Sequence, residues 1–363
     1  MKTLILVGGG HAHLHCLEQL NTESIKDWRV VLISSSVHQY YSGMFSGYTE
    51  GFYSLDDIRI DLERLCEKIG AVFIVDQIVS VDAEAKQLAG AHGKVYDYDL
   101  VSFDIGSTTA IPEGFEEQIS TIKPNFHFPE QLMRIREADY PVSVGGGASG
   151  VELAFSIHAW RKQQQLPLNL VLLSSRPLLS GQGSRVAKSI EAIADRKALS
   201  FFTGDKVREV NADNVLTQNG HSFPQTDVLW LTGPSSSGLF KSSGISTDRA
   251  GFLLVNNQLH SVEYPEVFGA GDCVSIEDFP TLPKNGVYAV RQGPILWRNL
   301  KNKINGEELK SFIPQKRFLS ILSTGNGETF LIYGRLLLHG KLPWFIKVAL
   351  DRQFMKRFQK IYE

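Results

Sequence analysis

Along the first part of the chain, short apolar runs alternate with segments whose apolar residues recur at helical spacing. A strand-like run at 3–7 leads into three glycines and a segment with helical spacing at about 11–21, and a second apolar run follows at 29–33. Short apolar runs that flank a helical segment are typical of buried parallel strands. The pattern predicts a βαβ unit, followed by a long loop and a helix around 56–69.

The same pattern recurs in the middle of the chain. An apolar run at 141–144 again precedes a glycine turn and a helical segment, so we expect a second βαβ unit to begin at Pro141. Between the two units, strand-like runs at 72–75 and 78–81 are separated by polar and charged residues. They indicate a small β-meander.

Composition and charge narrow the class of protein. The chain has 363 residues, 43% of them hydrophobic, which suffices for two or three units with sizeable cores. The formal net charge of -2 gives no electrostatic reason to expect a nucleic-acid partner. The first apolar run is too short for a signal peptide, and no stretch approaches the roughly 20 apolar residues of a membrane-spanning helix. We therefore expect a cytoplasmic protein.

Each βαβ unit carries a glycine-rich turn between its first strand and its helix. In a dinucleotide-binding turn the first glycine permits the tight reversal, the second lets backbone N–H groups approach a pyrophosphate, and the third lets helix and strand pack closely. The first turn has Gly8 and Gly10 but His13 at the third position. The second has glycine at all three positions, namely Gly145, Gly147 and Gly150. Two dinucleotides are therefore predicted.

Several further segments resemble a known family. The ordered segments 98–107, 145–154, 228–233 and 268–273 resemble the signatures of flavoproteins with two dinucleotide-binding domains. Within that superfamily the chain resembles the type II NADH dehydrogenases. It resembles in particular the NADH-dehydrogenase-like domains found alone or fused to selenide, water dikinase, through residues 41–44, 284–294 and 351–355.

The resemblance implies a domain plan. The fold class is α/β, with tandem Rossmann-like dinucleotide-binding domains of the three-layer ββα type and a small C-terminal cap. Turn sequences at 112–114 and 233–238 mark the crossovers between the domains. The predicted parts are an FAD-binding domain at 1–110 and 235–310, an NAD(P)H-binding domain at 111–234, and a cap or membrane-facing segment at 311–363.

The glycine turns and the resemblance together predict the cofactor-binding residues. FAD is expected at the first turn, and NADH or NADPH at the second. Asp272 matches the family's aspartate that bonds the ribityl chain of the flavin, and His11 is expected near the flavin pyrophosphate. The predicted set is Gly8, Gly10, His11, Ser34, Ser35, Gly106, Gly145, Gly147, Gly150, Arg176, Gly233, Gly271 and Asp272.

The acidic residue that usually bonds the adenosine ribose is absent from both units. Ser34 and Ser35 follow the second strand of the first unit, and Ser174 to Arg176 follow that of the second. An arginine in place of the carboxylate favours a 2′-phosphate, so NADPH is a candidate reductant beside NADH. The alternative interpretation is that Arg176 simply points into solvent.

Three residues are candidates for the chemistry. Glu152 lies near the start of the helix after the second turn, where the helix dipole favours a carboxylate, and the resemblance places it beside the flavin. Segment 284–294 corresponds to the family's flavin-edge helix, in which Gln292 is retained but the first Ala and Gln of the quinone-site pattern are replaced. Lys284 is a candidate to stabilise negative charge on a reduced flavin.

Cysteines and histidines exclude some chemistry. A redox disulfide needs a closely spaced pair, which the wide spacing of Cys16, Cys66 and Cys273 does not provide; a reducing compartment fits best. Electrons are therefore expected to pass from the flavin straight to the acceptor. Of the three alternating histidines near the first turn, only His11 and His15 share a helix face, so no metal site is predicted.

The C-terminal run 342–362 has two interpretations. At helical spacing one group of residues falls on an apolar side, namely Trp344, Val348, Phe354, Met355 and Phe358, with Lys347 and Asp351 intruding on it. The other side is cationic, with Arg352, Lys356, Arg357 and Lys360. Such a helix can lie on an anionic membrane, as the type II dehydrogenases use theirs. It can also be a cap packed on the core or at a homodimer seam, which the intruding charges favour.

The function predicted is that of an FAD-dependent NAD(P)H oxidoreductase. Hydride passes from the nicotinamide to the flavin, and electrons then go to a quinone or another small-molecule acceptor, with any contact to the inner face of the membrane peripheral. Two alternatives stay open: a flavin-binding redox sensor or partner module, and a flavoenzyme that serves selenium or sulfur metabolism. The complete second turn favours the enzyme, because a sensor need not bind a reductant.

Overall fold

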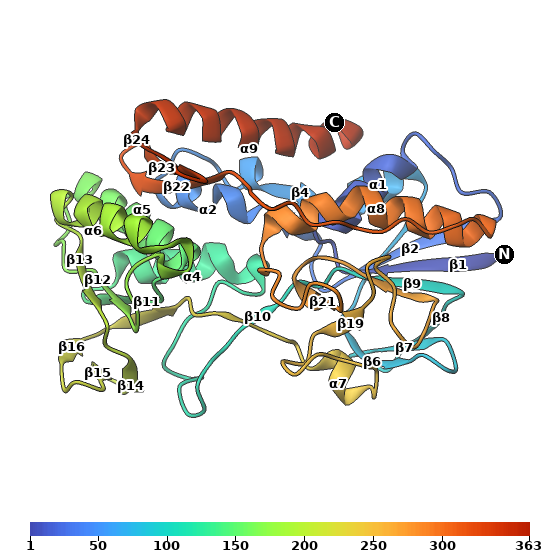
Figure 1. Ribbon diagram of the computed structural model, residues 1–363, viewed down its shortest axis with the longest axis horizontal. Helices are drawn as coiled ribbons and strands as arrows, with labels where there is room; N and C mark the ends of the chain where they lie inside the picture. Colours follow the sequence, from blue (N-terminus) through green and yellow to red (C-terminus); the bar gives the residue numbers. More distant parts are fainter.

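Two parallel sheets, each with helices on one face and a small antiparallel sheet on the other, form the frame of the computed structural model, which describes residues 1–363 (Figure 1). The first sheet has the strand order β20-β9-β1-β2-β5, and all its neighbours are parallel. Its strands are β1 (Lys2–Val7), β2 (Trp28–Ser34), β5 (Val72–Val75), β9 (Leu100–Phe103) and β20 (Val267–Gly269). Because both faces are covered, the central strands read as continuous apolar runs.

The second sheet repeats this plan in the order β13-β12-β11-β17, again fully parallel. Its strands are β11 (Pro141–Val144), β12 (Val171–Ser174), β13 (Ser200–Thr203) and β17 (Asp227–Trp230). A three-stranded antiparallel sheet follows the third strand of each unit: β6 (Ile78–Asp82), β7 (Gln87–Gly90) and β8 (Val95–Asp97) in the first, β14 (Val207–Val210), β15 (Asn214–Thr217) and β16 (Ser222–Pro224) in the second. The chain therefore contains one architecture twice.

Helices cover the opposite face of each sheet (Figure 1). In the first unit these are α1 (His11–Leu20) and α8 (Gly286–Asn305), and in the second α5 (Ala148–Gln163) and α6 (Ser184–Arg196). The two helices of the first unit approach closely at Gly293 of α8, where an added Cβ would lie 2.9 Å from the Cβ of His15. A larger residue there would push α8 away from α1.

The remaining elements connect these layers. Two short antiparallel strands, β10 (Thr108–Thr109) and β18 (Pro234–Ser235), join the two crossovers between the units. The others are β3 (His38–Tyr40), β4 (Arg59–Asp61), β19 (Leu253–Val255), β21 (Val274–Ile276), α2 (Phe45–Thr49), α3 (Leu62–Ile69), α4 (Phe128–Glu137), α7 (Leu239–Ser242), and the 3-10 turns η1 (Ser42–Met44), η2 (Asp56–Ile58), η3 (Asn125–His127), η4 (Ser180–Gln182) and η5 (Gly271–Cys273).

Two local predictions were wrong. The run Val72–Val75 is not part of the meander: it pairs in parallel with β2 and is the edge strand of the first sheet. The helix predicted around 56–69 begins only at Leu62, because the Asp61 carboxylate accepts a hydrogen bond from Arg64 N (2.9 Å) and caps it. The residues before it form η2 and strand β4.

The C-terminal residues form a cap that bridges both units. Strands β22 (Ser320–Gly325), β23 (Glu328–Tyr333) and β24 (Leu336–Gly340) form an antiparallel sheet, and helix α9 (Lys341–Tyr362) runs from it across the top of both units in Figure 1. Strand β22 packs on α5, and α9 packs on α1, α3 and β4. The larger of two apolar cores, with 71 buried residues, draws on both units and on the cap, and the smaller one, with nine, lies in the second unit.

Helix α9 presents its predicted apolar side to the protein. Trp344, Met355 and Phe358 are buried, and so are Lys347 and Asp351. The structure therefore agrees with a cap that packs on the protein along this face. The two charged side chains, Lys347 and Asp351, lie in the protein interior and not on a surface that could face lipid. No helix in the structure is both long enough and apolar enough to cross a membrane.

Candidate active site

The second glycine turn has the geometry that a pyrophosphate requires. A Cβ at Gly150 would overlap the carbonyl oxygen of Gly145, so the third glycine is what allows α5 to pack against β11. Gly145 itself has φ +138° and lies against the backbone of Leu231. A Cβ at Gly147, in contrast, would meet nothing within 4 Å. The open space is therefore at the second glycine, the position at which the dinucleotide-binding pattern predicts the approach of a pyrophosphate.

The N-terminus of α5 supplies donors to this space. Gly147 is its N-cap, and no side chain caps it. The first helical N–H group with an acceptor is that of Val151, which donates to Gly147 O (3.0 Å). The N–H groups of residues 148–150 have no acceptor in the structure. Three free donors at a helix N-terminus fit a pyrophosphate.

The polar residues at the strand ends lie where the predictions placed them. Ser34 is the last residue of β2 and is buried, whereas Ser35 is exposed. In the second unit the Ser174 hydroxyl donates to Arg176 O (2.6 Å) and closes its own turn. The Arg176 side chain is exposed and has no ion-pair partner. Arg176 is thus a free cation beside the second turn.

The first glycine turn is closed by side chains. His13 replaces the third glycine and is fully buried; its Nδ1 lies 2.6 Å from Gly8 O and its Nε2 2.8 Å from Ser102 Oγ. Burial lowers the pKa of His13 to about 4, so the ring is neutral at physiological pH. The imidazole therefore ties the turn to β9 instead of allowing the close approach that a glycine gives.

A buried carboxylate lies at the N-terminus of α1. Asp104, the residue after β9, accepts hydrogen bonds at Oδ2 from Ala12 N (2.7 Å) and His13 N (3.1 Å). Its backbone is part of the same turn, since Gly10 N donates to Asp104 O (3.2 Å). The sequence analysis did not single out this residue. An acidic side chain directly after a fully buried strand is the signal that could have found it.

Asp272 lies on the turn after β20. Lys123 Nζ is 3.2 Å from Asp272 Oδ2 and donates to Ser107 Oγ (2.6 Å), so a cation from the first crossover pairs with the predicted ribityl ligand. The turn itself is held by Gln292, whose buried Oε1 accepts a hydrogen bond from Gly271 N (2.6 Å). Gln292 thus supports the position of Asp272. Lys123 was missed because it is far from Asp272 in the sequence.

The other predicted residues of the first unit and of the crossover take the following positions. His11 packs near Tyr41 and Phe354, with ring centroids 5.6 and 5.5 Å away. Lys284 donates to Val274 O of β21 and lies over the ring of Phe252, the residue before β19, 4.5 Å from its centroid, so its cation is already engaged within the protein. Gly106 has φ +70°, and Gly233 O accepts a hydrogen bond from Ala110 N (3.1 Å) at the crossover.

Glu152 lies where the two units and the cap meet. It is on α5, and its Oε1 accepts hydrogen bonds from Ser46 Oγ of α2 (2.8 Å) and Ser323 N of β22 (2.9 Å). Lys347 Nζ of α9 is 3.9 Å from the same oxygen and 3.0 Å from Asp351 Oδ2. One residue therefore contacts the first unit, the cap sheet and the cap helix.

These groups form a buried cluster of one cation and two carboxylates. Burial raises the pKa of Glu152 and of Asp351, and the charge of Lys347 opposes this rise. Burial alone would lower the pKa of Lys347, but Glu152 and Asp351 more than offset it, so the pKa lies above its ordinary value. Because one ammonium cannot balance two buried carboxylates, the cluster is suited to holding an additional proton.

The three cysteines are free and buried. Burial raises the pKa of Cys66 and of Cys273 to about 12, and raises that of Cys16 as well. The thiolate is the reactive form, so none of these residues is poised for dithiol chemistry.

The sequence was compared with those of known protein families. The sequence pattern of the pyridine nucleotide-disulphide oxidoreductases matches residues 2–293. The chain belongs to this family. Membership confirms the predicted α/β fold class and the prediction of an oxidoreductase with FAD and a pyridine nucleotide as cofactors.

Individual relatives cover nearly the whole chain. A type II NADH:quinone oxidoreductase of Staphylococcus epidermidis is 23% identical over 96% of this chain and 94% of its own. The sulfide:quinone oxidoreductase structure of Aquifex aeolicus superimposes with a TM-score of 0.84 at 20% identity, over 99% of this chain and 92% of the other. The NDH2 structure of Plasmodium falciparum with NADH has a TM-score of 0.80 at 14% identity, over 99% and 97%. The resemblance to the selenide, water dikinase fusions stays a prediction.

Proposed function

We propose that this protein is an FAD-dependent NAD(P)H:quinone oxidoreductase. The observation that carries the proposal is the position of α5: its N-terminus, with three free N–H donors, leads within one turn to Glu152, which contacts Ser46 of the first unit. A nicotinamide nucleotide held by this helix is thus directed toward the flavin unit. The type II NADH:quinone oxidoreductase of similar length supports quinone as the acceptor.

Each turn has a proposed role. The first turn, Ser34, Ser35, Gly106 and the Gly271 and Asp272 turn would hold FAD, and the second turn, Gly233 and Arg176 would hold NADH or NADPH. This assigns 1–110 and 235–310 to the flavin and 111–234 to the nicotinamide. When bound, the flavin accepts hydride from the nicotinamide and passes electrons to the acceptor. The protein contributes orientation and polarity.

The buried cluster at Glu152 would serve the acceptor. Reduction of a quinone to a quinol consumes two protons (about one per electron), and proton transfer by a positioned side chain is effective when its pKa lies near the working pH. Glu152 and Asp351 have pKa values raised by burial, and Lys347 sits between them. We assign to this cluster the storage of a proton close to the junction of the two units. Gln292 and Lys284 would shape the flavin turn from the other side.

An anaerobic titration tests the proposal. The purified protein should carry non-covalent FAD, NADH or NADPH should bleach it, and a soluble quinone should restore the colour. Asp272→Ala should lower flavin retention, and Glu152→Gln should slow quinone reduction more than flavin reduction. A folded protein that takes up no FAD would overturn the proposal. Bleaching that is slow with both reductants would favour a sensor instead.

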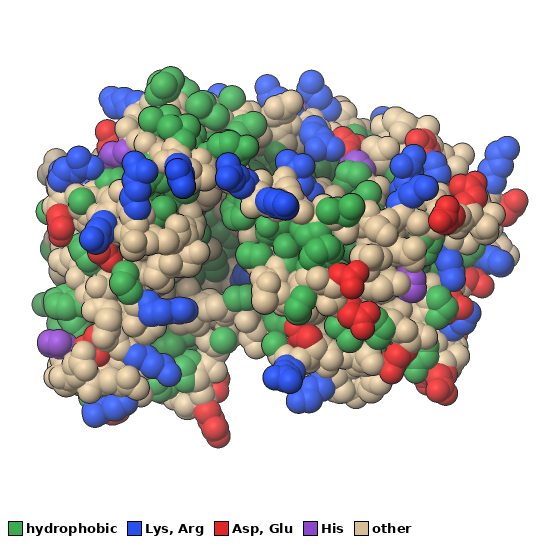
Figure 2. Space-filling view, viewed as in Figure 1, with side chains coloured by type: hydrophobic (Ala, Val, Ile, Leu, Met, Phe, Trp, Pro, Cys, Tyr) green, Lys and Arg blue, Asp and Glu red, His purple; other side chains and the backbone are tan.

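The outer face of the cap supports a membrane contact. The side chains of Leu342, Phe345, Ile346 and Leu350 on α9 are 72, 66, 41 and 47% exposed, and Leu336 and Leu338 on β24 are 50 and 44% exposed. Figure 2 shows hydrophobic side chains gathered over this end of the helix. These are not the residues the sequence analysis expected to insert, because Trp344 and Phe358 are buried. A continuous exposed apolar patch of this kind marks a docking surface.

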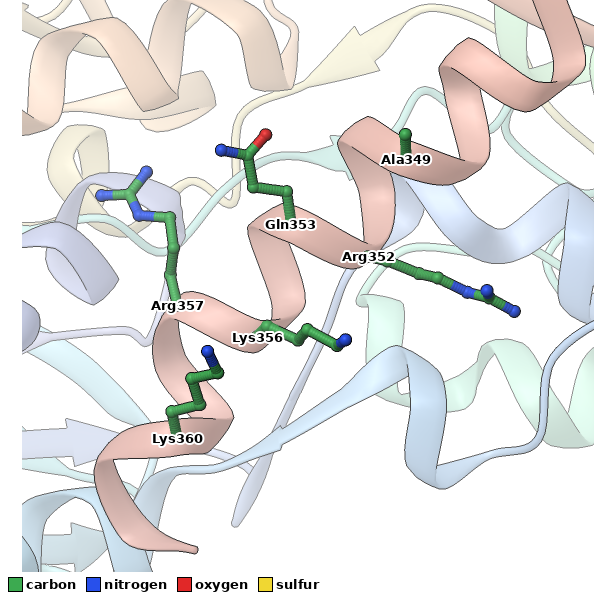
Figure 3. A pocket seen from close by; sticks show the side chains of 6 residues that line it. All are labelled: Ala349, Arg352, Gln353, Lys356, Arg357 and Lys360. Atoms are coloured by element: carbon green, nitrogen blue, oxygen red, sulfur yellow. The ribbon is translucent and has the colours of Figure 1, made fainter.

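Cations follow the apolar patch along the same helix. Arg352, Lys356 and Lys360 project from the outer side of α9 around a shallow groove (Figure 3). Arg357 lines it too, but its guanidinium pairs with Glu18 of α1 (2.5 Å) and so holds α9 onto the first unit. We propose that the apolar end of α9 inserts among lipid tails while the three free cations meet anionic headgroups, each adding roughly 1 kcal/mol.

Vesicle sedimentation tests this contact. Phe345→Ser with Leu350→Ser, and separately the triple change of Arg352, Lys356 and Lys360 to Glu, should reduce binding to anionic vesicles at low salt while leaving flavin reduction intact. As a control, Lys206, Arg208 and Lys241 are changed to Glu together, and this should not reduce binding. These exposed cations lie on or beside β14 and α7, which Figure 1 shows on the side of the molecule away from α9. Wild-type protein that ignores vesicles would overturn the membrane proposal alone.

A further inference from the structure

The two nucleotide turns differ in how many donors they leave free. In α5 three N–H groups, those of residues 148–150, have no acceptor. In α1 only His11 N is free, because Ala12 N and His13 N donate to Asp104 Oδ2 (2.7 and 3.1 Å). The helix N-terminus that faces the proposed flavin site therefore already holds a carboxyl group of the protein itself.

Asp104 is fixed between two turns of the proposed flavin site. A Cβ at Gly10 or at Gly271 would overlap the Asp104 carboxyl group, so both glycines are needed to accommodate it. The residue is 3% exposed, and its Oδ1 lies on the side of Gly271 and accepts no hydrogen bond. Any anion bound by His11 N lies next to this carboxyl, because one turn of helix supplies both.

The surrounding groups do not neutralise the carboxylate. Asp272 on η5 is a like charge, paired with Lys123. Cys16 of α1 and Cys273 of η5 are buried thiols, and His13 is neutral because burial lowers its pKa to about 4. Burial also lowers the pKa of His11. Burial raises the pKa of Asp104 itself to about 7, so the free protein carries this charge only on the alkaline side of neutrality.

We propose that FAD binding at the first turn is coupled to the uptake of one proton by Asp104. Two anions on one buried helix N-terminus repel each other, and neutralising the carboxyl removes the repulsion. The proton comes from solvent and is held between the carboxyl and its surroundings while the nucleotide is bound. The protonated carboxyl also gains an O–H donor, at a place where the helix offers the pyrophosphate only one free N–H. The inference rests on the proposed function, since it takes FAD to occupy this turn.

Calorimetry of FAD binding to the apoprotein in buffers of different ionisation enthalpy tests the proposal. We expect uptake of close to one proton at pH 8 and little at pH 6, with a dissociation constant about tenfold larger at pH 8. In Asp104→Asn the uptake at pH 8 should disappear and the affinity should become independent of pH. Proton uptake by His11 would persist in Asp104→Asn, so this variant distinguishes it from proton uptake by Asp104.

A matched control uses another buried carboxylate. Asp76 is 6% exposed, accepts a hydrogen bond from Tyr96 Oη (2.6 Å) and lies at the end of β5. Asp76→Asn should retain the full uptake of a proton. Wild-type protein that binds FAD without proton uptake would overturn the inference whether or not the variants fold, and so would equal uptake in Asp104→Asn. Failure to bind FAD at all would instead overturn the proposed function.

Discussion

At the scale of single residues, the glycines of the second turn divide into two kinds. The Cα of Gly150 faces the carbonyl oxygen of Gly145, whereas that of Gly147 faces open space. Gly150→Ala should therefore misfold the second unit or destabilise it by at least about 3 kcal/mol, because backbone atoms cannot give way. Gly147→Ala should leave the thermal unfolding temperature nearly unchanged but weaken NAD(P)H binding at least tenfold. Equal behaviour of the two variants would contradict this interpretation of the turn.

A second residue-scale prediction concerns the choice of reductant. Arg176 is exposed, free of ion pairs and adjacent to the end of β12, so it can meet a 2′-phosphate. At equal low concentration NADPH should reduce the flavin faster than NADH, and Arg176→Ala should remove the preference. Arg208→Ala, an exposed arginine on β14 of the same unit, is the control and should keep it. Equal rates in the wild type would dismiss the role of Arg176.

At the scale of elements, α9 depends on the charges that it buries. Replacing Lys347 by Met leaves Glu152 and Asp351 without their cation. Lys347→Met should lower the free energy of unfolding by about 3–5 kcal/mol at pH 8, where both carboxylates tend to ionise. The decrease should be smaller at pH 5, where protonation relieves the repulsion between them. The sign follows from the raised pKa values of both carboxyls, whose protonated forms the fold favours. Urea unfolding at the two pH values measures it.

The control for this prediction removes one of the stranded carboxylates. Lys347→Met combined with Asp351→Asn should recover part of the lost stability at pH 8. A single variant that loses the same free energy at both pH values would show that Lys347 acts by packing alone.

The sequence predicted the elements better than their partners. Strands β1, β2 and β11 and helix α1 follow from apolar runs and glycine turns, which are local signals. Val72–Val75 was assigned to the meander because an edge strand has the same local pattern whichever sheet it joins. For α9 the sequence left a membrane surface and the protein core both open, although the intruding Lys347 and Asp351 favoured the core. It did not predict that Glu152, on another helix, meets Lys347 in the interior. Lys123 was missed because Asp272, its partner, is far away in the sequence, whereas Asp104 has a local signal, its position directly after a buried strand.

At the scale of the whole molecule, the cap and both units share the larger of the two apolar cores. Phe358 of α9 is 1% exposed within the apolar cluster that also contains residues of the first and second sheets. Phe358→Ala should lower the free energy of unfolding by about 3–5 kcal/mol. Because this core joins the cap to both units, circular dichroism and tryptophan fluorescence should shift together in one transition. Separate transitions for the two signals would show that the units unfold independently.

The unequal closure of the two turns has a kinetic consequence. At α5 the turn offers free backbone donors and open space at Gly147, so we expect a ligand there to leave quickly. At α1 the turn is tied down by Asp104 and His13, and Lys123 pairs with Asp272 on the neighbouring turn, so we expect these contacts to slow the departure of a ligand. We therefore expect dissociation on two timescales: fast exchange at the second site on every catalytic cycle, and a residence at the first that spans many cycles. The same fold, present twice in the chain, would then hold one nucleotide as a tightly bound cofactor and bind the other as a substrate that exchanges in every cycle.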